Sequence, residues 1–366
     1  MLHVPVRKIL LVVSLAFLAS CEPENVNIET PESKVLNSLL EKSNKDQGKS
    51  NIPKAPKTEN LRDHILEAVS PTECGATEFT EVVWRHFSAL ASDELAVASM
   101  DHYLFLQQNA VRLGIGTDYF GRNGEYTKHV ERTRRSLERF WNMHNQIRVL
   151  GQHNETLDHR EKLSEIIWYS MQDLESKEDV YPMVDEILER NKLSPVLPDS
   201  PFFAADGVAR PDNEIILGDG LIQMFSETGL EESIVWSGIL SHEWAHQVQF
   251  DHFASWYPAG TFSSTAEETR AVELEADFFS GYYLTHKRGA TFNWKNVEQF
   301  FELFYQSGDC SFNFEQHHGT PLQRRKATFE GYLLAEAASK KGHILKAEEL
   351  HEIFVKQVLP QTVSSL

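Results

Sequence analysis

The residues of this chain best suited to chemistry are His242, Glu243 and His246, which stand in the sequence HEWAH. Two histidines four residues apart lie on one face of a helix, so both rings can reach one ion at about 2.0–2.1 Å. Glu243 can act as a general base, taking a proton from a metal-bound water and passing it to a leaving amine. Zinc lowers the pKa of such a water and polarises a carbonyl. The spacing therefore predicts a hydrolytic zinc site with His242 and His246 as ligands.

A catalytic zinc site needs a third protein ligand, and ELEAD at residues 273–277 offers one. Glu273 and Asp277 are also four residues apart, so Glu273 can complete the ligand set while Asp277 accepts the outer N–H of a ligand histidine. The simpler interpretation, that Glu273 and Glu275 are merely exposed helix carboxylates, is disfavoured by the apolar residues around them. Glu268 and Glu275 are weaker candidates for the third ligand. A set of two histidines and one glutamate favours Zn²⁺, although it can hold other divalent ions.

Three segments, HEWAHQVQ, ELEADFFSGYYL and HHGTPLQRRKATFEGYLL, resemble the gluzincin metallopeptidases. The closest likeness is to bacterial neutral zinc metallopeptidases and to lipid-anchored relatives of the heat-shock membrane proteases. The resemblance implies a zincin-like fold with Glu273 as third ligand and Asp277 behind a ligand histidine. It also implies that His318 and Arg324 stabilise an oxyanion or orient the site. His318 is equally well interpreted as a turn residue before a helix at Pro321, and His317 is the weaker of the two histidines.

The segment DNEIILGDGLIQMF, residues 212–225, is similar to the strand that precedes the active helix in these peptidases. In them it is an edge strand along which an extended substrate lies, held by main-chain hydrogen bonds. The likeness covers residues 205–335 and does not clearly extend to residues 61–190. The chain differs from the membrane proteases in lacking an apolar stretch long enough for a transmembrane helix, which puts a membrane-embedded substrate in doubt.

These residues must be positioned by helices and strands, and the sequence predicts an α+β fold that is mostly α-helical, with a small sheet beside the active-site helix. Apolar spacing predicts helices at residues 231–250, 265–286, 294–305 and 321–338, and mostly helix over 78–193. Short apolar runs bracketed by Pro, Gly and Asp predict strands at 202–205, 214–217 and 221–225, with another candidate at 146–150. We divide the chain into a mainly helical part, residues 61–193, and a zinc peptidase region, residues 194–366.

The first residues predict export and a lipid anchor. Arg7 and Lys8 precede an apolar run at residues 9–19, which has the length of a signal peptide rather than of a membrane span. The following LASC resembles a bacterial lipobox, which implies a signal peptide over residues 1–20 and lipidation of Cys21. An ordinary secretory signal is the alternative. Residues 21–60 are polar and predict a flexible tether, and a short helix is open at 34–42. In an exported protein, Cys74 and Cys310 can form a disulfide, which the sequence leaves open.

The amino-acid composition limits the kinds of molecule that this chain can bind. A net charge of −19 without a large basic cluster argues against nucleic acid. We therefore expect a protein or peptide substrate and a membrane contacted through the lipid on Cys21, in the bacterial cell envelope and facing the periplasm or the surface of the outer membrane. The remaining histidines considered, His129, His144, His153 and His159, stand among polar residues and are expected at the surface.

Two other functions compete with an envelope endopeptidase. One is a non-catalytic lipoprotein that acts as a chaperone or assembly scaffold, with residues 61–190 as its binding module. Glu243 argues against it, because a purely structural zinc site needs no base there and has a fourth protein ligand. The other is hydrolysis of cell-wall peptides, which the sequence does not distinguish from protein hydrolysis.

Overall fold

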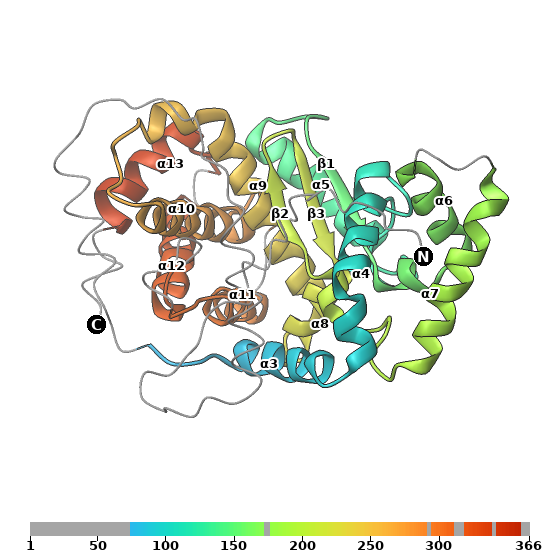
Figure 1. The fold of residues 1–366 in the computed structure, drawn as a ribbon. Coiled ribbons are helices and arrows are strands. Elements are labelled where there is room, and N and C mark those ends of the chain that lie inside the picture. Colours follow the sequence, from blue (N-terminus) through green and yellow to red (C-terminus); the bar gives the residue numbers. More distant parts are fainter. Residues whose placement is uncertain (1–73, 172–175, 291–293, 311–317, 339–341, 360–366) are drawn as a thin grey trace.

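The computed structural model describes residues 74–171, 176–290, 294–310, 318–338 and 342–359. Within them the chain is mostly helical and carries one small three-stranded sheet, which confirms the expected α+β class (Figure 1). No helix in these ranges is both long and apolar enough to cross a membrane. The predicted signal peptide, Cys21, the tether, the helix at 34–42 and His317 lie outside the described residues.

The first part of the described chain forms helices α3 (Glu78–Ala91), α4 (Glu94–Leu113), α5 (Thr127–Trp141), α6 (Arg160–Ser170) and α7 (Tyr181–Leu193). Local chemistry sets several of their ends. Thr77 and Asp93 accept hydrogen bonds from the free backbone N–H groups at the starts of α3 and α4. Gly114 ends α4 in the left-handed conformation that glycine adopts most easily. Apolar faces of α4, α6 and α7 share a core of their own.

The sheet joins the two parts into which we divided the sequence. Strand β1 (Arg148–Gln152) pairs in parallel with β3 (Glu214–Gly218), and β2 (Gly207–Arg210) pairs with β3 in antiparallel fashion. The order is β1-β3-β2, so β3 is the central strand, and all its residues are buried. A central, fully buried position is expected of a strand whose residues form a continuous apolar run.

Two of the predicted strands are wrong. Residues 201–204 form a 3-10 helix (Pro201–Ala204), and residues 219–226 form helix α8 (Asp219–Ser226). A short apolar run such as Leu221 to Phe225 does not distinguish a buried helix from a buried strand by its periodicity. Gly220 lets α8 pack directly against the 3-10 helix, because a side chain at this position would overlap the Pro201 carbonyl oxygen.

The later part of the chain forms α9 (Glu232–Trp256), α10 (Thr265–Thr285), α11 (Trp294–Gln306), α12 (Pro321–Ala338) and α13 (Ala347–Ile353). The four predicted helices of this region are therefore present, α12 with the predicted bounds. α9 runs beside the sheet and is buried on nearly every side, as expected of a helix with apolar residues all round (Figure 1). α10 and α12 approach closely because Gly281 and Gly331 let the two backbones touch.

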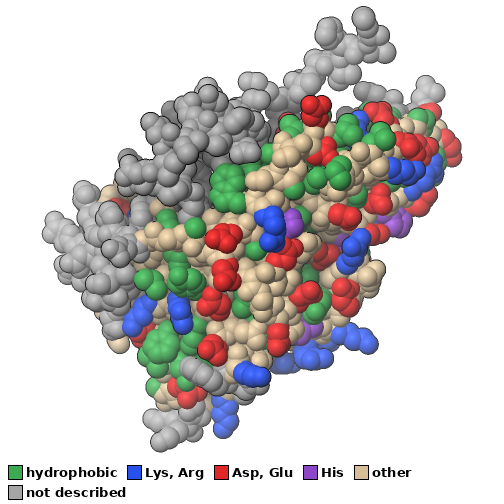
Figure 2. Space-filling model, turned by 90° about the horizontal axis from the view of Figure 1, so that it is seen from below, with side chains coloured by type: hydrophobic (Ala, Val, Ile, Leu, Met, Phe, Trp, Pro, Cys, Tyr) green, Lys and Arg blue, Asp and Glu red, His purple; other side chains and the backbone are tan. Residues whose placement is uncertain are grey.

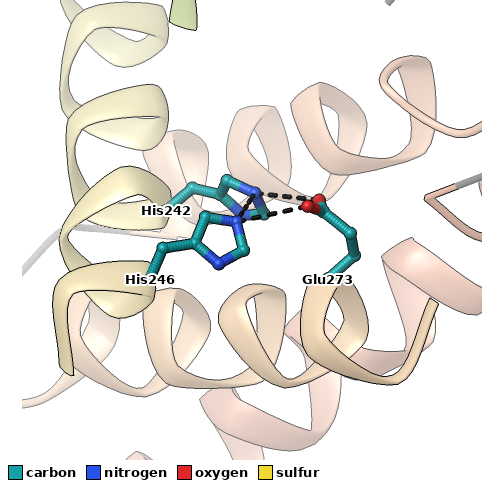
Figure 3. A group of neighbouring side chains, drawn as sticks. All are labelled: His242, His246 and Glu273. Carbon is teal, nitrogen blue, oxygen red and sulfur yellow. Dashed lines mark hydrogen bonds and ion pairs between the residues drawn. The ribbon is translucent and has the colours of Figure 1, made fainter. Parts of the chain in front are cut away.

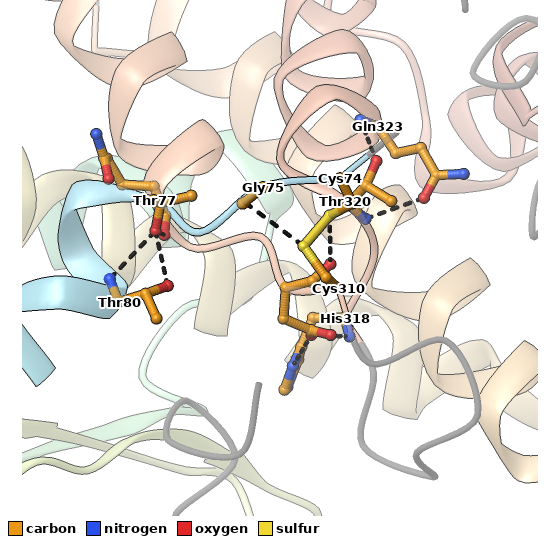
Figure 4. The surroundings of a disulfide bond; sticks show 10 residues. Cys74, Gly75, Thr77, Thr80, Cys310, His318, Thr320 and Gln323 are labelled. Carbon is orange, nitrogen blue, oxygen red and sulfur yellow. Dashed lines mark hydrogen bonds and ion pairs between the residues drawn. A yellow bond between two sulfur atoms is a disulfide. The ribbon is translucent and has the colours of Figure 1, made fainter. Parts of the chain in front are cut away.

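A disulfide joins Cys74 to Cys310, which settles the pairing that the sequence leaves open. It links the segment before α3 to the segment after α11, at a sequence separation of 236 residues (Figure 4). The Oγ of Thr77 and the backbone N–H of Phe79 donate hydrogen bonds to Gln306 close by. A native disulfide of this kind stabilises a fold by about 2–5 kcal/mol. The crosslink therefore fixes the beginning of the described chain against the segment that follows α11.

Candidate metal centre

Helices α9 and α10 bring three predicted ligands together. His242 and His246 project from one face of α9, and Glu273 projects toward them from α10 (Figure 3). The Nε2 atoms of the two histidines lie 3.1 Å apart. Glu273 Oε2 lies 3.1 Å from His242 Nε2, and Glu273 Oε1 lies 3.3 Å from His246 Nε2. All three side chains are almost entirely shielded from solvent.

These separations suit a tetrahedral cation. Ligand atoms at 2.0–2.1 Å from a tetrahedral zinc lie about 3.3 Å from one another. His242 Nδ1 lies 3.0 Å from Asp277 Oδ1, an ion-pair contact that is off the line of an ideal hydrogen bond. Because a carboxylate accepts and does not donate, this contact favours a proton on Nδ1 and a lone pair on Nε2. Lone pairs and carboxylate oxygens that converge in a buried space need a cation between them. The donor set therefore fits zinc.

Arg324 of α12 holds Asp277 from the far side. Its Nε and Nη2 donate to the two carboxylate oxygens of Asp277 at 2.7 and 2.8 Å, and its Nη1 donates to the Ser307 carbonyl at 3.2 Å. Its Nη2 also lies 3.4 Å from Glu273 Oε2. Burial disfavours the charge of the guanidinium, but the two carboxylates outweigh it and raise the pKa of Arg324 above its ordinary value. Arg324 is thus a buried cation that contacts both carboxylates.

Glu243 lies beside the ligands rather than among them. Glu243 is 3% exposed, and the backbone of Ala209 in β2 is close enough to favour the charged form of its carboxyl. Burial raises the pKa of Glu243, although the nearby charges of His242 and His246 oppose the shift. The sequence-based assignment of residues 212–225 to an edge strand is wrong, because β3 is central and β2 is the strand next to Glu243. Hydrophobicity alone could not order the strands, since the order depends on pairing with β1.

His318 contacts Asp309, the residue before the disulfide-bonded Cys310. Its backbone N–H donates to Asp309 Oδ2 at 2.9 Å, and its Nδ1 lies 3.5 Å from the same oxygen (Figure 4). Asp309 adjoins Cys310, so the crosslink and this carboxylate together hold His318. The side chain is buried, and a positive charge on its ring lowers the pKa of Glu273. The structure therefore brings His318 to the site, in addition to its position just before α12.

Charges in this pocket favour a bound cation. Burial lowers the pKa of His242, but Asp277 and Glu273 outweigh it and raise this pKa to about 10. Burial acts against the charge of Glu273, but His318, His246 and His242 hold the pKa of its carboxyl well below the ordinary value. The same negative field that stabilises a proton on His242 attracts a divalent ion, whose binding must displace that proton.

The two weaker ligand candidates are not in the ligand group. Glu275 lies behind His246, where its carboxylate accepts hydrogen bonds from Gln249 and Tyr257 and contacts His351. Glu268 belongs to no group of the described residues that could hold a metal. Sequence analysis missed Gln249 altogether, although its place one turn after His246 on a core helix could have marked it.

One of the four histidines expected at the surface is buried. His153 is 1% exposed, contacts Asp219 through Nδ1 at 2.6 Å and stacks on the ring of Tyr119. Its polar neighbours in sequence say nothing of these partners, which come from other elements. His144 and His159 are exposed as expected, whereas His129 is half-buried and contacts Ser237.

Acidic and basic side chains are mixed on the face of the molecule that Figure 2 shows. Figure 2 shows described acidic side chains scattered across one face, with Lys and Arg among them rather than in one continuous patch. With a net charge of −19, such a surface repels anionic polymers at long range.

Comparisons of this chain with family models, curated proteins and solved structures gave no match. The resemblance to gluzincins therefore rests on the sequence motifs alone.

Proposed function

We propose that this chain is a zinc-dependent endopeptidase of the bacterial cell envelope, with a zincin-like fold and a lipid anchor on Cys21. The main support for the proposal is that the side chains of His242, His246 and Glu273 lie close together, with Glu243 beside them. Among the described residues these three ligands form a group without a fourth His, Cys, Asp or Glu. Catalytic zinc sites keep such an open position for water or substrate, whereas structural sites close it.

Each side chain of the site has a distinct part in the proposed reaction. When bound, zinc polarises the scissile carbonyl and lowers the pKa of a water. Glu243 takes a proton from the attacking water and passes it to the leaving nitrogen. Its raised pKa suits this transfer, because a base works best when its pKa lies near the working pH. His318 stabilises the developing oxyanion or the charge of Glu273, and Arg324 keeps Asp277 against His242.

Strand β2 supports an extended substrate in this proposal. It is an outer strand of the described sheet and packs against α9, which carries Glu243. A peptide that adds to such an edge is held mainly by its main chain, which implies weak selectivity for side chains. Proteins or peptides in extended conformation are therefore the substrate class that we propose.

Removal and return of the metal test this function. We expect the purified chain to cleave a reduced, alkylated protein, to lose cleavage after treatment with 1,10-phenanthroline, and to regain it with added Zn²⁺. Fragment formation followed by mass spectrometry measures the result and shows whether internal bonds are cut. Cleavage that is indifferent to the chelator, or no cleavage by the zinc-loaded chain, would contradict the proposal.

A further inference from the structure

Gln249 makes an unusual contact for a buried glutamine, because its side chain lies against the outer nitrogen of a ligand. It is fully buried on α9, three residues after His246. Its Oε1 lies 2.7 Å from His246 Nδ1. His242 has a charged carboxylate in the corresponding position, so the two ligand histidines have different supports.

Orientation of the Gln249 amide is fixed by its other contacts. Its Nε2 donates to the Val272 carbonyl at 2.8 Å and to Glu275 Oε2 at 2.9 Å. Both partners only accept hydrogen bonds, so a flipped amide would set an oxygen against two acceptors. Oε1 must therefore face His246, and Nδ1 of His246 must carry the proton that joins them. The lone pair of that ring is then on Nε2, toward Glu273 and His242.

A further layer holds Glu275 in turn. The Tyr257 hydroxyl donates to Glu275 Oε2 at 2.8 Å, and His351 of α13 contacts Oε1 through Nδ1 at 2.7 Å. The carboxylate is fully buried, and the His351 ring stacks on Trp256 of α9. The network thus joins α9, α10 and α13 behind one ligand. Its last link to His246 is a neutral amide, which adds no further carboxylate to a pocket that already holds Glu273, Asp277 and Glu243.

We infer that Gln249 is a positioning residue, which selects the metal-binding tautomer of His246 and is itself locked by Val272 and Glu275. The inference rests on the proposed function only in requiring that the three ligands bind a metal. Loss of such an outer partner lowers metal affinity by roughly 10–100-fold in metal sites. We expect a loss of this size when Gln249 is replaced, without any change in the ligands.

A matched pair of glutamines on α9 gives the experiment. Gln249→Met removes the contact with His246. Gln247→Met removes a glutamine that is equally buried and that donates two hydrogen bonds, but to the carbonyls of Arg210 and Glu214 in the sheet region. Zn²⁺ affinity measured by competition with a chromogenic chelator should fall roughly 10–100-fold in Gln249→Met and less than about 3-fold in Gln247→Met. Equal losses in both variants, or none in Gln249→Met, would overturn the inference.

A second measurement does not depend on the variant folding. Long-range ¹H–¹⁵N correlation spectra of the zinc-loaded wild-type chain report which ring nitrogen of each histidine carries a proton. We expect His246 to be protonated at Nδ1, and protonation at Nε2 would overturn the inference. A wild-type chain that binds no Zn²⁺ would overturn both this inference and the proposed function. Normal zinc binding in Gln249→Met would overturn the inference alone.

Discussion

Glu243→Gln is expected to lower the rate of peptide hydrolysis by about 10²–10⁴-fold, which is the contribution of a well-placed general base. Glutamine has nearly the same shape as glutamate, so it fits the same buried position. It cannot take a proton from the attacking water. Because Glu243 is outside the ligand group, the bound zinc should remain. The expected signature is therefore a nearly inactive protein with a full metal content.

Asp251→Asn is the matched control for this change. It makes the same exchange of carboxylate for amide at an exposed position of α9. The kcat/KM for an unfolded protein substrate, with metal content determined on the same samples, should fall only in the Glu243 variant. Equal activity of wild type and Glu243→Gln would show that this carboxyl takes no part in proton transfer.

Arg324→Met should destabilise the fold by about 3–5 kcal/mol, because it leaves a buried carboxylate without its main partner. Asp277 is fully buried and receives two of its hydrogen bonds from Arg324. The guanidinium also bonds the Ser307 carbonyl and offsets part of the charge of Glu273. Methionine fills part of the space but supplies none of these donors. Removing only one member of a buried charge network costs more than the network itself contributes.

Arg325→Met provides the comparison, since it removes the same charge from the next position of α12. Arg325 is exposed, and surface changes of this kind shift stability by less than about 0.5 kcal/mol. The free energies of unfolding should be measured by urea denaturation of the metal-free proteins, so that altered zinc binding does not enter. A loss in the Arg324 variant no larger than that in Arg325→Met would show that the buried pair does not support the fold.

The sequence could predict those site residues whose positions follow from the spacing of residues along a helix. His242 and His246, and likewise Glu273 and Asp277, are separated by one helical turn, and this spacing alone sets each pair on one face. Apolar spacing likewise predicted the four helices from α9 to α12. The roles of His318 and Arg324 were implied by resemblance rather than by spacing, and the structure places Arg324 Nη2 3.4 Å from Glu273 Oε2.

Contacts between distant elements could not be predicted. Gln249 donates to Glu275, and Glu275 contacts His351, only because α9, α10 and α13 pack together, and nothing in the local sequence indicates this. The burial of His153 depends on Tyr119 and Asp219, from a loop and a helix far along the chain. The strand order likewise depends on β1, which lies more than sixty residues before β3. Short apolar runs were misassigned for a related reason, since tertiary packing decides between helix and strand.

Metal content is the measurement that tests the central claim most directly. Wild type and Glu273→Leu should be loaded with Zn²⁺, dialysed and examined by elemental analysis, with Glu268→Leu on the same helix as the control. We predict close to one zinc per chain in wild type and in Glu268→Leu, and little or none in a folded Glu273→Leu chain, because the two histidines then lack their third ligand. A wild-type chain without zinc, or a Glu273→Leu chain that keeps it, would contradict the account.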